Sequence, residues 1–258
     1  MISNIALGII YKDDAWSLAQ TAPTYAGVFR DKVILNFGAE QPPVDTFWDV
    51  CTAPWPNDYA AARNSLLKYV QNFRRATWIL MLDADEAMFP DDLVSLSRWV
   101  ESCTADAVYF PRINFVRDAQ HWLPGNYPDY QTRLIRLGSD VHYVNAVHEC
   151  SAGAKPRVMA PYHIYHYGLC RPAQHVFERW RAYAALAGKQ APAVMPPNFD
   201  AYGGLGRQEA WDKEHPLQGA RGVVRSTPAC NAQQDKNSHH HQPVQSRPRP
   251  RYTPYRLR

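Results

Sequence analysis

An uninterrupted apolar run, residues 78–82, leads directly into the acidic sequence Asp83-Ala84-Asp85-Glu86. Apolar residues without polar alternation are typical of a strand that is covered on both faces, as in a parallel α/β sheet. Ligands of such sheets gather at the carboxyl ends of the strands. Because residues i and i+2 of an extended segment point the same way, we expect the carboxylates of Asp83 and Asp85 to converge at this end.

Helical and strand-like patterns alternate on both sides of this run. One helical pattern follows the capping residues Asn57 and Asp58, and a second opens at Pro90. We expect helices over residues 58–73, 90–100 and 172–187, and strands over residues 5–11, 33–37, 107–115, 130–136, 141–147 and 161–167. The alternation predicts one α/β domain in which helices flank a sheet.

The paired carboxylates predict a site for a hard divalent cation, Mn2+ or Mg2+. The alternative is that an aspartate at a strand end serves only the turn or caps a helix. Glu86 continues the acidic cluster, and we expect it to cap the helix that begins at Pro90 rather than to bind metal-bound water.

Two carboxylates are candidates for a general base, a group that takes a proton from a hydroxyl group of a substrate. Glu149, which follows the strand-like residues 141–147, is the leading one, and its neighbour His148 would orient it or touch the metal. Asp129 lies in a turn-rich aromatic loop and is the second candidate. His121 and Trp122 would belong to the acceptor side, although large aromatic residues also build cores.

Five ordered motifs resemble those of family 2 glycosyltransferases, which use nucleotide sugars and have the GT-A fold. They are residues 58–64 (DYAAARN), 78–86 (WILMLDADE), 130–136 (YQTRLIR), 147–149 (VHE) and 166–168 (HYG). Ordered matches are more specific than any single motif. The resemblance implies a Rossmann-like, mixed and mainly parallel sheet flanked by helices. It also implies a nucleoside diphosphate sugar as donor, for which we expect a UDP-sugar, and inversion at the anomeric carbon by direct displacement.

The resemblance also assigns roles to single residues. It places Arg63 at the nucleotide end of the donor, together with Asp58 and Asp83. For Arg63 the alternative is a solvated helix arginine paired with Asp58. It also makes His166 the third metal ligand; His163 lies three residues earlier on the same strand and would face the opposite side.

The sequence departs from the family pattern at the end of the second strand. Asn36 stands where family members carry an acid that contacts the nucleobase. An amide has both donors and an acceptor for a base edge, so we keep Asn36 as a nucleotide contact and leave the nucleobase open.

Composition and charge place these elements in one domain with a separate carboxyl-terminal region. The 258 residues, 46% of them hydrophobic, suffice for one catalytic domain, which we expect over residues 1–187. Near Gly188 the composition shifts to an irregular extension, residues 188–225, and then to a basic Pro/Arg-rich tail, residues 226–258, which we expect to be disordered. Its arginines could contact an anionic surface weakly.

The chain lacks an apolar run of membrane-spanning length and a signal-like start. Its five cysteines show no paired CxxC spacing, which suits a reducing compartment. We therefore expect a cytoplasmic protein, with peripheral contact at the inner membrane surface as an option.

Together these patterns predict a metal-dependent glycosyltransferase that acts on an unidentified hydroxyl acceptor. Among such enzymes, we expect a hexosyltransferase. Two alternatives remain: a nucleotidyltransferase that uses the same carboxylate pair, and a sugar- or nucleotide-binding protein without turnover. Neither a phosphate-binding loop of the GxxxxGK[ST] type nor a Gly-x-Ser-x-Gly turn is present, which argues against kinases and serine hydrolases.

Overall fold

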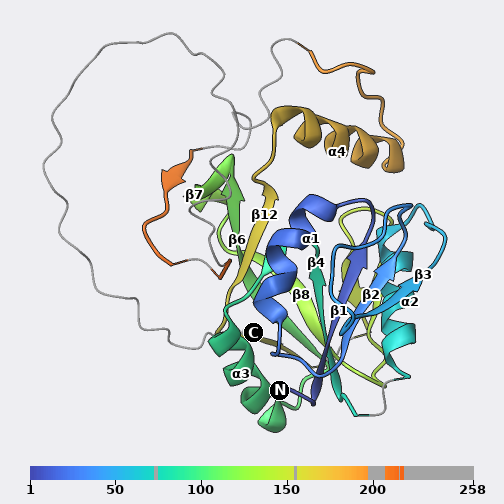
Figure 1. Cartoon of the computed structure of the whole chain (residues 1–258), viewed down its shortest axis with the longest axis vertical. Helices are drawn as coiled ribbons and strands as arrows, with labels where there is room; N and C mark the ends of the chain where they lie inside the picture. The colour runs from blue at the N-terminus through green and yellow to red at the C-terminus, as the bar shows by residue number, and fades with distance from the viewer. Residues whose placement is uncertain (73–74, 154–155, 197–206, 215, 218–258) are drawn as a thin grey trace, which may run out of the picture. The chain divides into compact units, whose positions relative to one another are not determined.

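The computed structural model describes residues 1–72, 75–153, 156–196, 207–214 and 216–217 (Figure 1). They fall within one compact unit, Met1–Arg225. The expected basic tail, residues 226–258, lies outside the described residues, and the expected division of the chain near residues 187 and 225 stays a prediction.

One mixed sheet forms the centre of this unit. Along its main path the strands are β13 (Glu209–Ala210), β7 (Asp118–Trp122), β6 (Ala107–Val116), β8 (Asp129–Arg136), β4 (Trp78–Asp83), β1 (Ile5–Tyr11), β2 (Lys32–Asn36) and β3 (Asp49–Thr52). The four strands from β4 to β3 run parallel, whereas β8 is antiparallel to both β4 and β6. The parallel half brings the carboxyl ends of β1 and β4 side by side.

Shorter strands complete the sheet around β6. β11 (Arg157–Met159) and β12 (Ile164–Leu169) pair with β6 in parallel, and β12 also pairs with β5 (Glu86–Ala87). β9 (His142–Val144) and β10 (Cys150–Ala152) form a separate two-stranded ribbon. The β12–β5 pair is important for the site, because it places His166 opposite Glu86.

Helices cover both faces of the parallel half, which confirms the expected α/β fold of the GT-A type as far as its class is concerned (Figure 1). The α-helices are α1 (Ala15–Thr21), α2 (Tyr59–Val70), α3 (Pro90–Trp99) and α4 (Ala173–Leu186), and the 3-10 helices are η1 (Ala22–Tyr25), η2 (Val100–Ser102) and η3 (Pro124–Asn126). Alternate residues of β1 belong to different cores: Ile9 packs in the cluster that includes Leu18 of α1 and Leu93 of α3, and Ala6 packs in the cluster that includes Leu66 of α2.

Gly8 of β1 lets α2 approach the sheet closely. A Cβ atom at this position would lie 2.9 Å from Cδ1 of Ile79 and 3.1 Å from Cδ2 of Leu66. A larger residue would therefore require the ends of these two side chains to shift, Ile79 of β4 and Leu66 of α2.

Several elements coincide with the sequence-based expectation and others do not. β1 has the expected bounds, α3 begins at Pro90 as expected, and β4 ends at Asp83. The expected strand over residues 141–147 is only the three-residue β9, and α1, β3 and β7 were not expected. Every helix in the described ranges is too short or too polar to cross a bilayer.

Candidate active site

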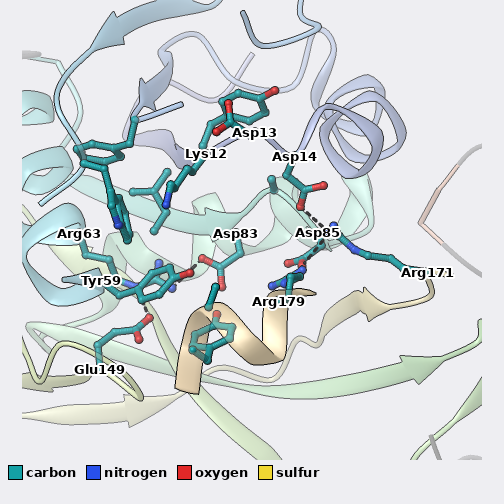
Figure 2. A pocket seen from close by; sticks show the side chains of 17 residues that line it. Lys12, Asp13, Asp14, Tyr59, Arg63, Asp83, Asp85, Glu149, Arg171 and Arg179 are labelled. Carbon is teal, nitrogen blue, oxygen red and sulfur yellow. Dashed lines mark hydrogen bonds and ion pairs between the residues drawn. The ribbon is translucent and has the colours of Figure 1, made fainter. Parts of the chain in front are cut away.

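A pocket with a volume of about 300 Å³ opens at the carboxyl ends of β1 and β4 (Figure 2). It is lined by residues 10–14 and 83–85 after these strands, by Tyr59 and Arg63 of α2, by Arg179, Ala182 and Tyr183 of α4, and by Phe37, Trp55, Glu149 and Arg171. This is the sheet edge at which the sequence placed a site.

Arg63 is a buried guanidinium that joins two carboxylates across the pocket floor. Its Nη2 donates to Oδ1 of Asp83 at 2.7 Å, and its Nε donates to Oε1 of Glu149 at 2.7 Å. Burial lowers its pKa, but the charges of Asp83 and Glu149 outweigh that effect and raise it overall. Arg63 is thus neither solvated nor paired with Asp58, and its buried Nη1 is left without a hydrogen-bond partner among the described residues.

Asp83 is fully engaged by arginines. Its Oδ1 accepts from Arg63, and its Oδ2 accepts from Nη2 of Arg133 at 2.9 Å. Burial raises its pKa, yet the two arginines outweigh burial and lower it overall. Asp83 lines the pocket, but its oxygens already hold two cationic partners.

Glu86 lies beneath the pocket and does not cap α3, so that prediction was wrong. Its side chain is fully buried, accepts from Arg133 at 2.8 and 2.9 Å and from Arg112 at 3.0 Å, and ties the turn together by accepting from the backbone N–H of Asp83. Burial raises its pKa, but Arg133 and Arg112 together hold the pKa at about 2. The reason for the wrong prediction is β5: Glu86 belongs to a strand that pairs with β12 instead of to the loop before α3.

Glu86→Gln is expected to lower the free energy of unfolding by about 3 kcal/mol or more, since removing one member of a buried charge network leaves the arginines uncompensated. In the wild type the folded-state pKa is depressed, so this stabilisation is present above the ordinary pKa of 4.5 and is lost as pH falls towards about 2. Urea unfolding at neutral pH and from about pH 5 to about pH 2 measures both effects.

The exposed Glu101, in η2, supplies the matched control. Glu101→Gln should leave the unfolding free energy within about 0.5 kcal/mol of the wild type. Equal stability of the Glu86 and Glu101 variants at neutral pH would show that the buried network contributes nothing.

Asp85 is the second pocket carboxylate and uses different partners from Asp83. Its Oδ2 accepts from Nη1 of Arg179 at 2.8 Å and lies 3.5 Å from Nη2 of Arg171 (Figure 2). Burial raises its pKa, but Arg179, His166 and Arg171 outweigh burial and lower it overall. The two aspartates are not alternate residues of one extended strand, because β4 ends at Asp83 and residues 84–85 form a turn.

His166 faces the other oxygen of Asp85. Its Nε2 lies 3.6 Å from Oδ1 of Asp85, and its Nδ1 lies 2.7 Å from Oδ1 of Asn114. The amide nitrogen of Asn114 donates to Asp129, so the amide oxygen accepts and Nδ1 of His166 carries the proton. Burial and Arg112 lower the pKa of His166 to about 4 despite the opposing charge of Asp85. Near neutral pH, Nε2 therefore turns an electron pair towards Asp85.

Gly168 keeps the space beside this pair open. A Cβ atom there would lie 2.5 Å from Nε2 of His166 and 2.8 Å from Oδ2 of Asp85. The described residues contain no group of three or more His, Cys, Asp or Glu side chains placed to hold a metal ion. Two potential ligand atoms converge here, not the three that the sequence predicted.

Glu149 combines a fixed position with a free oxygen. Arg63 holds Oε1, whereas Oε2 accepts no hydrogen bond from the described residues. Its side chain is 15% exposed, so the pocket can deliver a hydroxyl group to it. His148 is exposed and does not line the pocket. Among the described residues its side chain makes no hydrogen bond to Glu149 or Asp85, so the expected role of orienting Glu149 or touching the metal has no support in this geometry.

Three other expected site residues, Asp58, Asn36 and Asp129, do not line this pocket, and neither does His166, which contacts the lining residue Asp85. Asp58 caps α2 by accepting from the backbone N–H of Ala61, and the buried Asn36 uses its amide on Gly38 and Glu40 in its own turn. The third residue, Asp129, accepts from Arg112, Asn114 and Gln131. Burial raises the pKa of Asp129, but Arg112 and the hydrogen bonds lower it overall, which disfavours a role as proton acceptor.

His121 and Trp122, which we expected on the acceptor side of the site, also do not line the pocket. Trp122 packs against Tyr127 and Trp211, and His121 pairs with Asp118. His163 approaches the hydroxyl of Tyr127 at 2.9 Å, so His166 is the histidine of this strand region that faces a pocket carboxylate. The aromatic residues form a core cluster here, which was the alternative for them.

Sequence reasoning missed the contribution of α4 and of the residues just before it. Arg171 joins Asp14 and Ser17 of the α1 amino terminus to Asp85, and Arg179 reaches Asp85 from α4. The helical pattern of residues 172–187 was predicted from its apolar residues alone. The signal that could have found Arg179 is its spacing of one helical turn from Tyr183, since both side chains line the pocket.

No protein-family model matches the sequence, and no curated protein matches it significantly. Among solved structures it is similar to S. aureus TarS 1-349, with 12% identity and a TM-score of 0.43 over 71% of this chain and 65% of that chain. The same protein in complex with UDP gives 10% identity and a TM-score of 0.43 over 71% and 65% of the two chains. Its complex with UDP-GlcNAc gives 10% identity and 0.42 over 71% and 66%. The chain spans less than two thirds of the length of these structures.

Proposed function

We propose that the chain transfers a sugar from a nucleoside diphosphate sugar to a hydroxyl acceptor. One observation carries the proposal: Arg63 lines the pocket with a buried Nη1 that has no hydrogen-bond partner among the described residues, and its Nε holds the carboxylate of Glu149. The guanidinium of Arg63 thus carries a hydrogen-bond donor for a phosphate oxygen and also holds Glu149, a possible proton acceptor. Displacement of a nucleoside diphosphate by a hydroxyl group requires both of them.

The pocket has the size and walls of a small-ligand site. Its volume of about 300 Å³ lies at the lower end of such sites, and Phe37, Trp55 and Tyr59 line it as a connected aromatic group. Nζ of Lys12 lies 4.6 Å from the ring centroid of Trp55. These residues offer a stacking surface for a nucleobase, whereas Asn36 is buried and does not line the pocket.

The charge of the pocket favours a cation as a further component. Five lining carboxylates face four lining Lys and Arg side chains, which leaves a formal charge of minus one before an anionic donor enters. We propose that Asp85 and His166 hold Mn2+ or Mg2+, because the proton on Nδ1 of His166 leaves Nε2 free beside Oδ1 of Asp85. Such ions commonly take few protein ligands and complete their shell with substrate phosphates and water.

In this proposal Asp83 holds two arginines and does not bind the cation. It fixes Arg63 and Arg133 with its two oxygens and would bind a cation directly only after giving up one of them. When bound, the cation would offset the negative charge of the diphosphate.

The residues of the chain then divide the reaction between them. Oε2 of Glu149 takes the proton of the acceptor hydroxyl, whose oxygen forms the new bond to the anomeric carbon. The bond from that carbon to the diphosphate oxygen breaks, and Nη1 of Arg63 donates to the departing group. Direct displacement inverts the anomeric centre, as the family resemblance implies. We expect a hexose as the transferred sugar and UDP as the first nucleotide to test.

Calorimetric titration with UDP, GDP, CDP and dTDP, and with UTP for contrast, tests this function with and without Mn2+. We expect one diphosphate to bind, and to bind more tightly with Mn2+. A preference for UTP would favour a nucleotidyltransferase, and absence of binding by all five nucleotides would overturn the proposal in favour of a protein without this donor site.

The acceptor and the cellular location remain predictions. A contact with an anionic surface was assigned to residues 226–258, which lie outside the described residues. A cytoplasmic location is likewise proposed from the sequence, not from the pocket.

A further inference from the structure

We infer that Arg179 of α4 binds the diphosphate of the donor, which makes α4 part of the donor site. The inference rests on the proposed function. Nothing in the motifs of the sequence points to α4, whose residues follow the last of them. Arg179 nevertheless lines the pocket (Figure 2), as do Ala182 and Tyr183 of the same helix.

Arg179 has donors to spare. A guanidinium carries five N–H groups, and among the described residues Arg179 uses Nη1 in one hydrogen bond, to Oδ2 of Asp85 at 2.8 Å. Its side chain is 37% exposed, whereas that of Asp85 is 3% exposed. The remaining N–H groups can therefore reach a ligand without breaking the bond to Asp85.

The position of Arg179 is fixed by its helix. Tyr183, one turn later, stacks on Tyr59 of α2 with ring centroids 5.3 Å apart and an interplanar angle of 18°. Val176, Phe177 and Ala184 are buried on the same helix. Ordering a long arginine side chain costs conformational entropy, and these contacts together with Asp85 reduce that cost before a ligand arrives.

A diphosphate suits the two arginines that line this pocket from different helices. Arg63 of α2 offers the buried Nη1, and Arg179 of α4 offers its exposed N–H groups. Phosphate oxygens accept charge-assisted hydrogen bonds from such planar groups, often two at a time. The N–H groups that these two arginines do not use on Asp83, Glu149 and Asp85 suit oxygens that carry negative charge, so we assign this part of the pocket to the diphosphate.

The test compares the affinity for nucleoside diphosphates with that for the matching monophosphates. UDP, GDP, CDP and dTDP and their monophosphates are titrated into the wild type, Arg179→Gln and Arg179→Lys at saturating Mn2+. Arg179→Gln should weaken diphosphate binding by about 10- to 100-fold, the scale of a hydrogen bond to a charged group, and leave monophosphate binding within about twofold. Arg179→Lys should fall between, because it keeps the charge but loses the planar pair of donors.

Arg181→Gln is the matched control, since Arg181 lies on the same helix but does not line the pocket. It should bind like the wild type, and melting curves of all variants exclude a general loss of fold. Equal weakening of mono- and diphosphate binding by Arg179→Gln, or no weakening, would overturn the role of Arg179 and leave the proposed function standing. Failure of the wild type to bind any diphosphate would overturn both.

Discussion

Replacing Asp85 by Ala is expected to abolish the Mn2+-dependent part of nucleoside diphosphate binding and to slow sugar transfer by about a thousandfold. That factor corresponds to about 4 kcal/mol of lost transition-state stabilisation, the scale of a bound cation at a developing charge. The substitution removes the only carboxylate in the described structure that faces Nε2 of His166 within an ion-pair distance. Calorimetry with and without Mn2+ and the rate of nucleotide release measure the two effects.

The variant carries its own reference. Arg63 and Arg179 remain, so diphosphate binding in the presence of a chelator should persist in Asp85→Ala even as the Mn2+ effect disappears. Asp91→Asn, at an exposed position in the first turn of α3, should behave as the wild type. An unchanged Mn2+ effect in Asp85→Ala would show that the cation binds elsewhere or that none is used.

Glu149→Gln is expected to slow transfer by about a hundredfold or more, the scale of a lost general base, while the affinity for the donor stays nearly intact. Glutamine retains an oxygen that can accept from Nε of Arg63, so the guanidinium should stay in place. It cannot take a proton from the acceptor hydroxyl. Steady-state kinetics should therefore show a loss in kcat at similar donor KM.

The two variants are most informative together. Asp85→Ala should lose the Mn2+-dependent part of donor binding, and Glu149→Gln should keep it and fail in turnover. Equal loss of donor binding in both would contradict the separate roles assigned here. Glu101→Gln, on the surface, serves as the carboxylate control for turnover.

Much of the fold could be predicted because the apolar patterns are local. The bounds of β1, the start of α3 and the end of β4 follow from runs and spacings within about ten residues. β7 was missed because its sequence, with polar residues at most positions, lacks an apolar pattern. Its place is set by pairing with β6, which no local pattern shows.

The site was predictable where a motif coincided with a strand end, and not where a contact spans the chain. Asp85, Glu149 and Arg63 line one pocket as the motifs indicated. Asp58 fills a helix cap, a role that favours the same residue type as a ligand site does. Arg179 was missed because its partner Asp85 lies 94 residues away, while the helix around it shows only an apolar pattern.

The clearance beside Gly168 limits what can evolve or be engineered at this position. The nearest atoms to an added methyl group would be the histidine nitrogen and the aspartate oxygen, and neither belongs to a flexible surface chain that could swing aside. Only glycine therefore fits at position 168 between two elements that are distant in sequence, β12 and the turn after β4, without movement of His166 or Asp85. A larger residue there would have to displace the side chain of His166 or of Asp85.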